Sequence, residues 1–133
     1  AVLGFNAFVR ASLIIAVNKR SRMTPAVRRG YLLPYNSWRN RIATLRFVQD
    51  IPRSPEEETY RVLAGMEEKL RLLKHRRMLI LWGALDWCFN KDFLHRWQHY
   101  FPDARTVVFP DASHYILEDA HENVIPHVLE FLK

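Results

Sequence analysis

Apolar residues recur at a helical period through the first half of the chain. They lie three or four positions apart in four segments, which are residues 5–17, 25–33, 37–47 and 55–73. Proline marks the breaks between these segments: Pro25 suits the first turn of a helix, whereas Pro34 and Pro52 interrupt the pattern. The pattern therefore predicts a series of amphipathic helices and no strand in the first 73 residues.

The segment 55–73 has the clearest start signal. Ser54 is a suitable N-cap, Pro55 fits the first turn, and Glu57 stands three residues after Ser54, as in a capping box. One face of this helix is expected to be buried. Its apolar positions are Val62, Leu63, Met66 and Leu70.

The second half changes character. Residues 78–82 form a continuous apolar run that ends at Gly83, and residues 106–109 form a second short run; both are typical of strands buried on both faces. A helical period covers residues 91–100 between them, and a final helix is expected after a cap near Asp119. The order strand, helix, strand, helix predicts an α/β fold with parallel strands joined by helical crossovers.

Two side chains that can carry chemistry follow the predicted strands. Asp86 stands three residues after Gly83, and His114 stands five residues after the second strand. Reactive groups gather at the carboxyl ends of parallel strands, so we expect the two to meet if the strands are neighbours. A carboxylate bonded to one imidazole nitrogen fixes the tautomer and leaves the other nitrogen free to take a proton. The alternative is a loop aspartate and a loop histidine with no common task.

Composition and charge indicate which binding partners and which cellular compartment to expect. The 20 Lys and Arg against 14 Asp and Glu give a net charge of +6, but the basic clusters are scattered, which favours a solvated surface over a nucleic-acid site. The single cysteine cannot form an internal disulfide, so we expect a cytoplasmic protein. The longest apolar stretch, residues 7–17, contains Arg10 and is shorter than the about 20 residues that span a bilayer, so no membrane span is expected.

Metal and cofactor signals are weak. His95 and His99 stand four apart on a predicted helix, a spacing that can bind a metal, but no further ligand pattern accompanies them. Exposed helix histidines are the favoured interpretation. We therefore expect no metal and no cofactor.

Several ordered motifs share the spacing of a known enzyme family. They are Leu79-Ile80-Leu81-Trp82-Gly83-x-x-Asp86, Phe93-Leu94-x-x-Trp97, Phe101-Pro102-x-Ala104 and Asp111-Ala112-x-His114-Tyr115-x-x-Glu118-Asp119. Together they resemble the C-terminal part of an α/β-hydrolase, and the haloalkane dehalogenase-like branch in particular. Upstream, the pattern from Tyr31 to Pro52 resembles the helical cap of that branch. The resemblance implies the C-terminal portion of a three-layer α/β-hydrolase fold, with a cap segment at 1–73 and a βαβα core segment at 74–133.

The resemblance also implies a function and roles for individual residues. Enzymes of this kind act on small apolar substrates through a covalent ester, with the counterpart of Asp86 as the acid and that of His114 as the base. Trp38 and Trp87 are candidates to line the substrate cavity, although ordinary packing is the favoured interpretation of both. The sequence is also similar to the β-lactone decarboxylases of bacterial olefin synthesis.

The nucleophile of the family has no counterpart in this sequence. It sits on a tight elbow with flanking glycines four residues apart, and no two of Gly4, Gly30, Gly65 and Gly83 have that spacing. The chain is therefore expected to need an N-terminal half for a complete core and to be inactive alone. The alternatives are a serine esterase or epoxide hydrolase of the same fold, or a non-catalytic binding protein.

Overall fold

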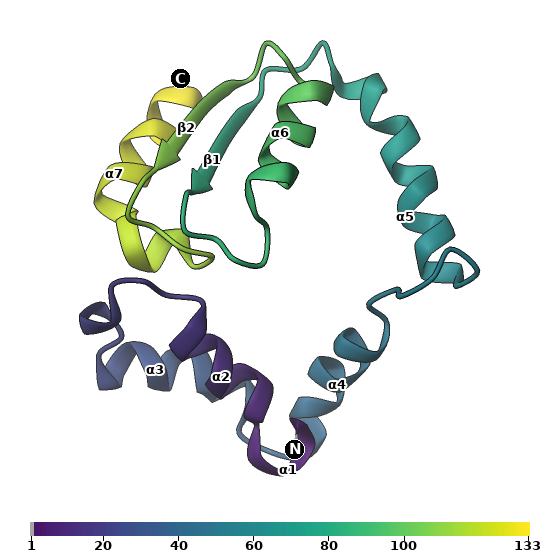
Figure 1. The fold of residues 1–133 in the computed structure, drawn as a ribbon. Coiled ribbons are helices and arrows are strands. Elements are labelled where there is room, and N and C mark those ends of the chain that lie inside the picture. Colours follow the sequence, from purple (N-terminus) through teal and green to yellow (C-terminus); the bar gives the residue numbers. More distant parts are fainter. Residues whose placement is uncertain (1) are drawn as a thin grey trace.

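The computed structural model describes residues 2–133, and its elements follow one another around a ring that brings α2 and α3 back beside the end of the sheet (Figure 1). The first half is helical. Its helices are α1 (Val2–Phe5), α2 (Ala7–Ile15), α3 (Pro25–Leu32), α4 (Ile42–Gln49) and α5 (Glu58–Lys69). Single 3₁₀ turns lie between or beside them, at Arg20–Arg22, Leu33–Tyr35, Arg39–Arg41 and Leu70–Leu73. The predicted helical character of this half is confirmed.

The first predicted helix is divided in two at Asn6, whose φ of 52° is left-handed. Asparagine tolerates this conformation better than most residues, so the break falls there. Val9 and Leu13 are buried as their period predicts, but Phe5 and Phe8 are 78% and 41% exposed. Phe5 ends α1, before the break, and Phe8 lies in the first turn of α2, so the buried face of this segment is confined to α2.

Two predicted helix starts have different outcomes. The Thr24 hydroxyl accepts a hydrogen bond from the N–H of Val27 at 3.3 Å, which confirms the start of α3. The capping box at Ser54 is wrong, because α5 begins only at Glu58 and has no side-chain cap. Instead the N–H of Glu57 donates to the backbone oxygen of Ser54 at 3.2 Å, which closes a turn before the helix.

The apolar face of α5 is exposed rather than buried. Val62, Leu63 and Met66 are 55%, 50% and 59% exposed. An open groove of about 690 Å³ separates α5 from the helix that follows the first strand, so Leu63 and Met66 line a groove instead of a packed core. The expected burial of this face is therefore wrong within residues 2–133.

The second half forms a small parallel sheet. Strand β1 (Leu79–Gly83) pairs with β2 (Arg105–Phe109), and Leu81 faces Val107 in the register. Helix α6 (Lys91–Tyr100) connects the strands and α7 (Ile116–Phe131) follows them. The two helices lie on either side of the sheet in Figure 1. The predicted order of elements and the parallel pairing are confirmed, and the chain has a mixed α/β fold.

The main core lies between α7 and the sheet. Its buried members are Phe109, Ala112, Ala120 and Val124, with Leu81, Val107, Ile116 and Val128 packed against them. Strand β1 is less enclosed than predicted, because only Ile80 and Gly83 are buried along it. A sheet of two strands lacks neighbours to cover both faces, which accounts for the difference.

The predicted helix cap at Asp119 is also wrong. Helix α7 begins at Ile116, before Asp119, and its backbone departs from helical geometry at Ala120, where φ is −147°. The Asp119 side chain is fully buried and accepts hydrogen bonds from the backbone N–H groups of Asn18, Lys19 and Ser113.

A second cluster joins the N-terminal helices to the loop after β2. Leu13, Val17 and Met23 are buried in it, and Tyr31 and Tyr115 pack against them as stacked rings 5.4 Å apart. The helical half of the chain thereby contacts the loop that carries His114.

Candidate active site

Asp86 and His114 lie together at the carboxyl edge of the sheet. The His114 Nδ1 is 2.9 Å from the Asp86 Oδ2, although the residues are 28 positions apart. Neighbouring parallel strands end at the same edge, so the loops after β1 and β2 bring the side chains into contact. The structure thus brings together the pair that the sequence singled out; a catalytic role for it stays a prediction.

The backbone of the β1 loop holds the Asp86 carboxylate in place. Its Oδ1 accepts hydrogen bonds from the N–H groups of Cys88 and Phe89, both at 2.9 Å, and its side chain is only 10% exposed. The remaining oxygen, Oδ2, is therefore directed at His114. An ionised carboxylate only accepts hydrogen bonds, so with Asp86 ionised this contact assigns an N–H to Nδ1 of His114 and leaves Nε2 as the ring nitrogen that Asp86 does not bind.

Aromatic and apolar side chains surround the imidazole. Its ring lies 5.3 Å from that of Phe89 and 5.9 Å from that of Tyr115, between ring centroids. A pocket of about 180 Å³ opens beside it, with Leu81, Trp82 and Ile116 among its lining residues. The His114 side chain remains 29% exposed, so a small molecule in this pocket can reach it.

Gly83 allows the loop of Asp86 and the loop of His114 to lie close to each other. A β-carbon at this position would lie 2.7 Å from the Ala112 backbone oxygen and closer still to that of Ser113. Because real β-carbons do not tolerate such contacts, only glycine fits at the end of β1. The N–H of Leu85 donates to the Ala112 oxygen at 3.0 Å, which joins the loop of Asp86 to the loop of His114.

The two tryptophans predicted to bind substrate lie elsewhere. Trp87 is 59% exposed, and its indole N–H donates to the backbone oxygen of Ile15 at 2.9 Å. Trp38 is 61% exposed and precedes the 3₁₀ turn at Arg39–Arg41. Neither lines the pocket beside His114, so their role in substrate binding stays a prediction.

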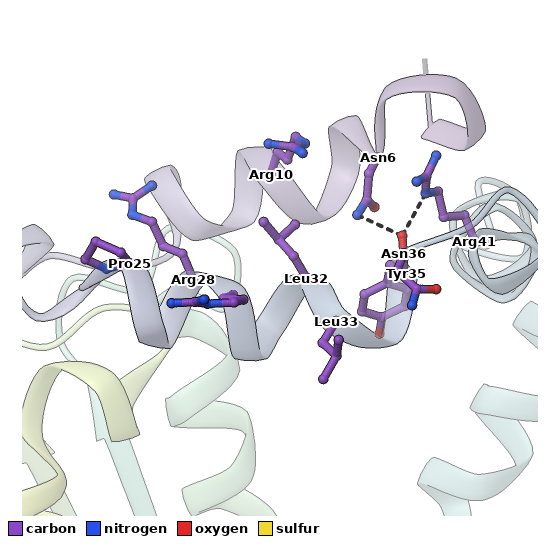
Figure 2. A pocket seen from close by; sticks show the side chains of 10 residues that line it. Asn6, Arg10, Pro25, Arg28, Leu32, Leu33, Tyr35, Asn36 and Arg41 are labelled. Atoms are coloured by element: carbon purple, nitrogen blue, oxygen red, sulfur yellow. Dashed lines mark hydrogen bonds between the residues drawn. The ribbon is translucent and has the colours of Figure 1, made fainter.

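A separate pocket of about 520 Å³ lies between α2 and α3 and is rich in arginine (Figure 2). The Asn6 amide and the Arg41 Nε both donate to the Tyr35 backbone oxygen, at 3.4 and 2.8 Å, which holds one end of this pocket together. None of the predicted site residues lines it.

Residues 2–133 contain neither a metal-binding cluster nor a membrane-spanning helix. No group of three His, Cys, Asp or Glu side chains there could hold a metal ion, and His95 and His99 belong to no such group. Among the same residues, no helix combines the length and the apolar character needed to cross a membrane.

Sequence reasoning missed the structural importance of Asp119. Its position just before the apolar period of the last helix resembles a cap, whereas its carboxylate bonds to the backbone of Ser113, next to His114. The Glu118-Asp119 pair was part of the motif around His114, which was the available signal.

Comparison with known proteins gives two relatives that share one name. No protein-family model matches the chain. A cis-3-alkyl-4-alkyloxetan-2-one decarboxylase of Shewanella oneidensis is 43% identical over 131 residues, which are 98% of this chain and 41% of the relative. A protein of the same name from Xanthomonas campestris pv. campestris is 42% identical over 129 residues, or 97% of this chain and 42% of the relative. Nearly the whole chain is thus similar to these two proteins, which are named as decarboxylase enzymes. It spans about two fifths of their length.

Proposed function

We propose that this chain is part of a β-lactone decarboxylase and that Asp86 and His114 form the carboxylate–histidine pair of its active site. The observation that carries the proposal is the 2.9 Å hydrogen bond between the two side chains at the carboxyl edge of the sheet. The similarity to two named oxetan-2-one decarboxylases supports the choice of substrate class.

The proposal includes the fold of the whole protein. Residues 74–133 would be the C-terminal part of an α/β-hydrolase core, and residues 1–73 a helical cap. The parallel pairing of β1 with β2 and the reactive loops at their carboxyl ends support this assignment. The nucleophile would come from the part of the protein that corresponds to the rest of the relatives' length.

An oxetan-2-one is a four-membered lactone ring, and its loss of CO₂ leaves an alkene. In the proposed first step a carboxylate of the enzyme attacks ring carbon C4, the bond from C4 to the ring oxygen breaks, and the electron pair moves to that oxygen. The product is a covalent ester that carries a free carboxylate. In the second step the C2–C3 bond breaks, its electron pair forms the C3=C4 double bond, and the enzyme carboxylate leaves C4. The sequence of steps consumes no water and no proton.

His114 would act in the second step. Negative charge moves from the substrate carboxylate to the departing enzyme carboxylate, and an imidazolium whose Nε2–H points at it stabilises that charge. Asp86 supports the imidazolium through Nδ1–H and fixes its orientation. The apolar side chains of the pocket beside His114 suit an alkyl-substituted ring and limit access of water.

A hydrolase of the haloalkane dehalogenase type is the second candidate, favoured by the spacing of the motifs from Leu79 to Asp119. There His114 would take a proton from water, and the water would cleave the ester. The two candidates differ in their products. Decarboxylation of a β-lactone gives CO₂ and an alkene, whereas its hydrolysis gives a β-hydroxy acid.

The test uses the full-length protein with a cis-3,4-dialkyl-oxetan-2-one and identifies the products by mass spectrometry. We expect alkene and CO₂ in equal amounts, with no β-hydroxy acid. A variant such as His99→Ala, on the exposed side of α6, should match the parent, and His114→Ala should lose turnover. Formation of the hydroxy acid, or no turnover of the lactone by the parent, would overturn the proposal.

A further inference from the structure

Asp119 is a fully buried carboxylate that the proposed reaction does not use. Its Oδ2 accepts hydrogen bonds from the N–H groups of Ser113 and Asn18, at 2.8 and 3.0 Å, and its Oδ1 accepts one from the N–H of Lys19 at 2.7 Å. All three donors are backbone groups, and two of them are about 100 positions away in the sequence.

A carboxylate is costly to bury unless hydrogen bonds replace its hydration. The Lys19 ammonium does not supply the compensation, because it pairs with the exposed Asp111 at 2.6 Å. The three charge-assisted bonds from the backbone supply it instead. Each of those bonds also fixes the position of a backbone segment, so the buried charge ties residues 18–19 to the loop before α7.

Hydrogen bonds hold the backbone on both sides of His114. Ser113, which Asp119 holds, directly precedes His114, and its hydroxyl donates to the backbone oxygen of Leu85 at 3.2 Å, next to Asp86. On the other side of His114, the N–H of Tyr115 donates to the backbone oxygen of Ala16 at 2.8 Å. The backbone on both sides of His114 is therefore anchored to the segment that links α2 to α3.

We propose that Asp119 is a positioning residue: it holds the loop of residues 16–19 against the loop of His114 and so sets the orientation of the imidazole toward Asp86. The N-terminal helical segment thus controls the geometry of the pair through Asp119. The proposal rests on the proposed function only in assigning a reaction to His114.

The first test is Asp119→Asn in the full-length protein. The amide can accept through one atom only, so at least one of the backbone N–H groups loses its partner. We expect kcat on the β-lactone to fall by about tenfold to 10²-fold, the scale of a misplaced catalytic group, with little change in KM. The matched control is Asp111→Asn, which removes a carboxylate from the exposed side of the same loop and should leave kcat within twofold.

A second pair of variants changes only the donor. Lys19→Pro removes the N–H that bonds to Asp119, at a position whose φ of −84° is close to that of proline. Lys19→Ala removes the same side chain and keeps the N–H. We expect Lys19→Pro to lower kcat in the same way as Asp119→Asn, and Lys19→Ala to resemble the parent.

The Nδ1–H proton of His114, observed by NMR without substrate, separates this inference from the proposed reaction. We expect its resonance in the parent, Asp111→Asn and Lys19→Ala, and its shift or loss in Asp119→Asn and Lys19→Pro. An unchanged resonance and kcat in folded Asp119→Asn would overturn the inference. Failure of both Asp119→Asn and Lys19→Pro to fold would also overturn it, because the carboxylate would then serve folding alone.

Discussion

The backbone oxygen of Ala112 lies 2.7 Å from the point that a β-carbon on Gly83 would occupy. This close approach brings the loop after β2 over the end of β1, where Asp86 and His114 meet. Glycine at this position is therefore a requirement of the site as well as of the strand.

Replacement of Gly83 by alanine should move the two loops apart. We expect Gly83→Ala to lower the free energy of unfolding of the full-length protein by about 1–3 kcal/mol, the usual cost of overpacking, and to lower kcat. Gly65→Ala is the matched control, because a β-carbon there meets nothing within 4 Å and α5 gains helix propensity. Denaturant unfolding measures both variants, and equal stability of Gly83→Ala and the parent would contradict the prediction.

Asp86→Asn should keep the fold and lose most of the activity. The amide can still accept from Cys88 and Phe89 through its oxygen, but its NH₂ group then faces His114 and favours the wrong imidazole tautomer. Loss of the orienting acid costs on the order of 10⁴ in rate in serine proteases. We expect a fall in kcat that approaches this factor, measured in the full-length protein.

The control for this prediction is Asp92→Asn, in the exposed first turn of α6. It removes one carboxylate near the same loop and should change kcat by less than twofold. Activity of Asp86→Asn within threefold of the parent would show that another carboxylate orients His114.

The meeting of Asp86 and His114 was predictable because it depends on topology. Two apolar runs with a helix between them imply parallel strands, and parallel strands place their following loops at one edge. The position of Asp119 was not predictable, because a short acidic residue before an apolar helical period resembles a cap whatever its long-range partners are. Its actual partners, Asn18 and Lys19, lie in a polar loop that carries no pattern.

The apolar period of α5 correctly predicts an apolar face on this helix, but the burial expected for that face is not found. The period predicts that one face of α5 packs against an apolar surface. Within residues 2–133, that face of α5 borders the groove toward α6 instead. Periodicity shows that a face needs a partner, but it does not show which part of a protein supplies that partner. The same holds for β1, because a two-stranded sheet cannot cover all the apolar side chains of this strand.

The ion pair between Arg22 and Glu122 should make stability sensitive to acid. The hydrogen bond from the Arg22 guanidinium, 2.7 Å at Nη1, lowers the pKa of Glu122 from 4.5 to about 2. A carboxyl group with a lowered pKa stabilises the fold above its unfolded value of about 4.5, and this contribution is lost as the pH falls toward 2. We expect Glu122→Gln to lower the Tm by a few degrees at most at pH 7, and the difference from the parent to vanish near pH 2.

Thermal unfolding of the full-length protein at a series of pH values checks this prediction. The control is Glu68→Gln on the exposed surface of α5, which removes a carboxylate outside this ion pair. A Tm difference for Glu122→Gln that grows as the pH falls would contradict the sign.

Residues 1–133 produced as an isolated chain should self-associate. Large apolar side chains are exposed on many elements, and both strands of the sheet have one edge without a strand partner among residues 2–133. Such edges and patches promote association. We expect oligomers or precipitation by light scattering, and a monodisperse monomer with a sharp cooperative melt would favour a self-contained binding protein.

His114→Ala separates the carboxylate nucleophile from a serine nucleophile. A carboxylate is already charged and attacks without a base, whereas a serine hydroxyl needs histidine to remove its proton before the attack. In the full-length protein with a β-lactone, the carboxylate mechanism predicts that His114→Ala forms the ester but completes the second step slowly. Intact mass spectrometry should then show the protein heavier by one whole lactone, because ring opening retains every atom. Asp119→Asn should show the same adduct to a smaller extent, since its imidazole is present but misoriented. An unmodified mass for His114→Ala, on a lactone that the parent converts, would favour the serine mechanism.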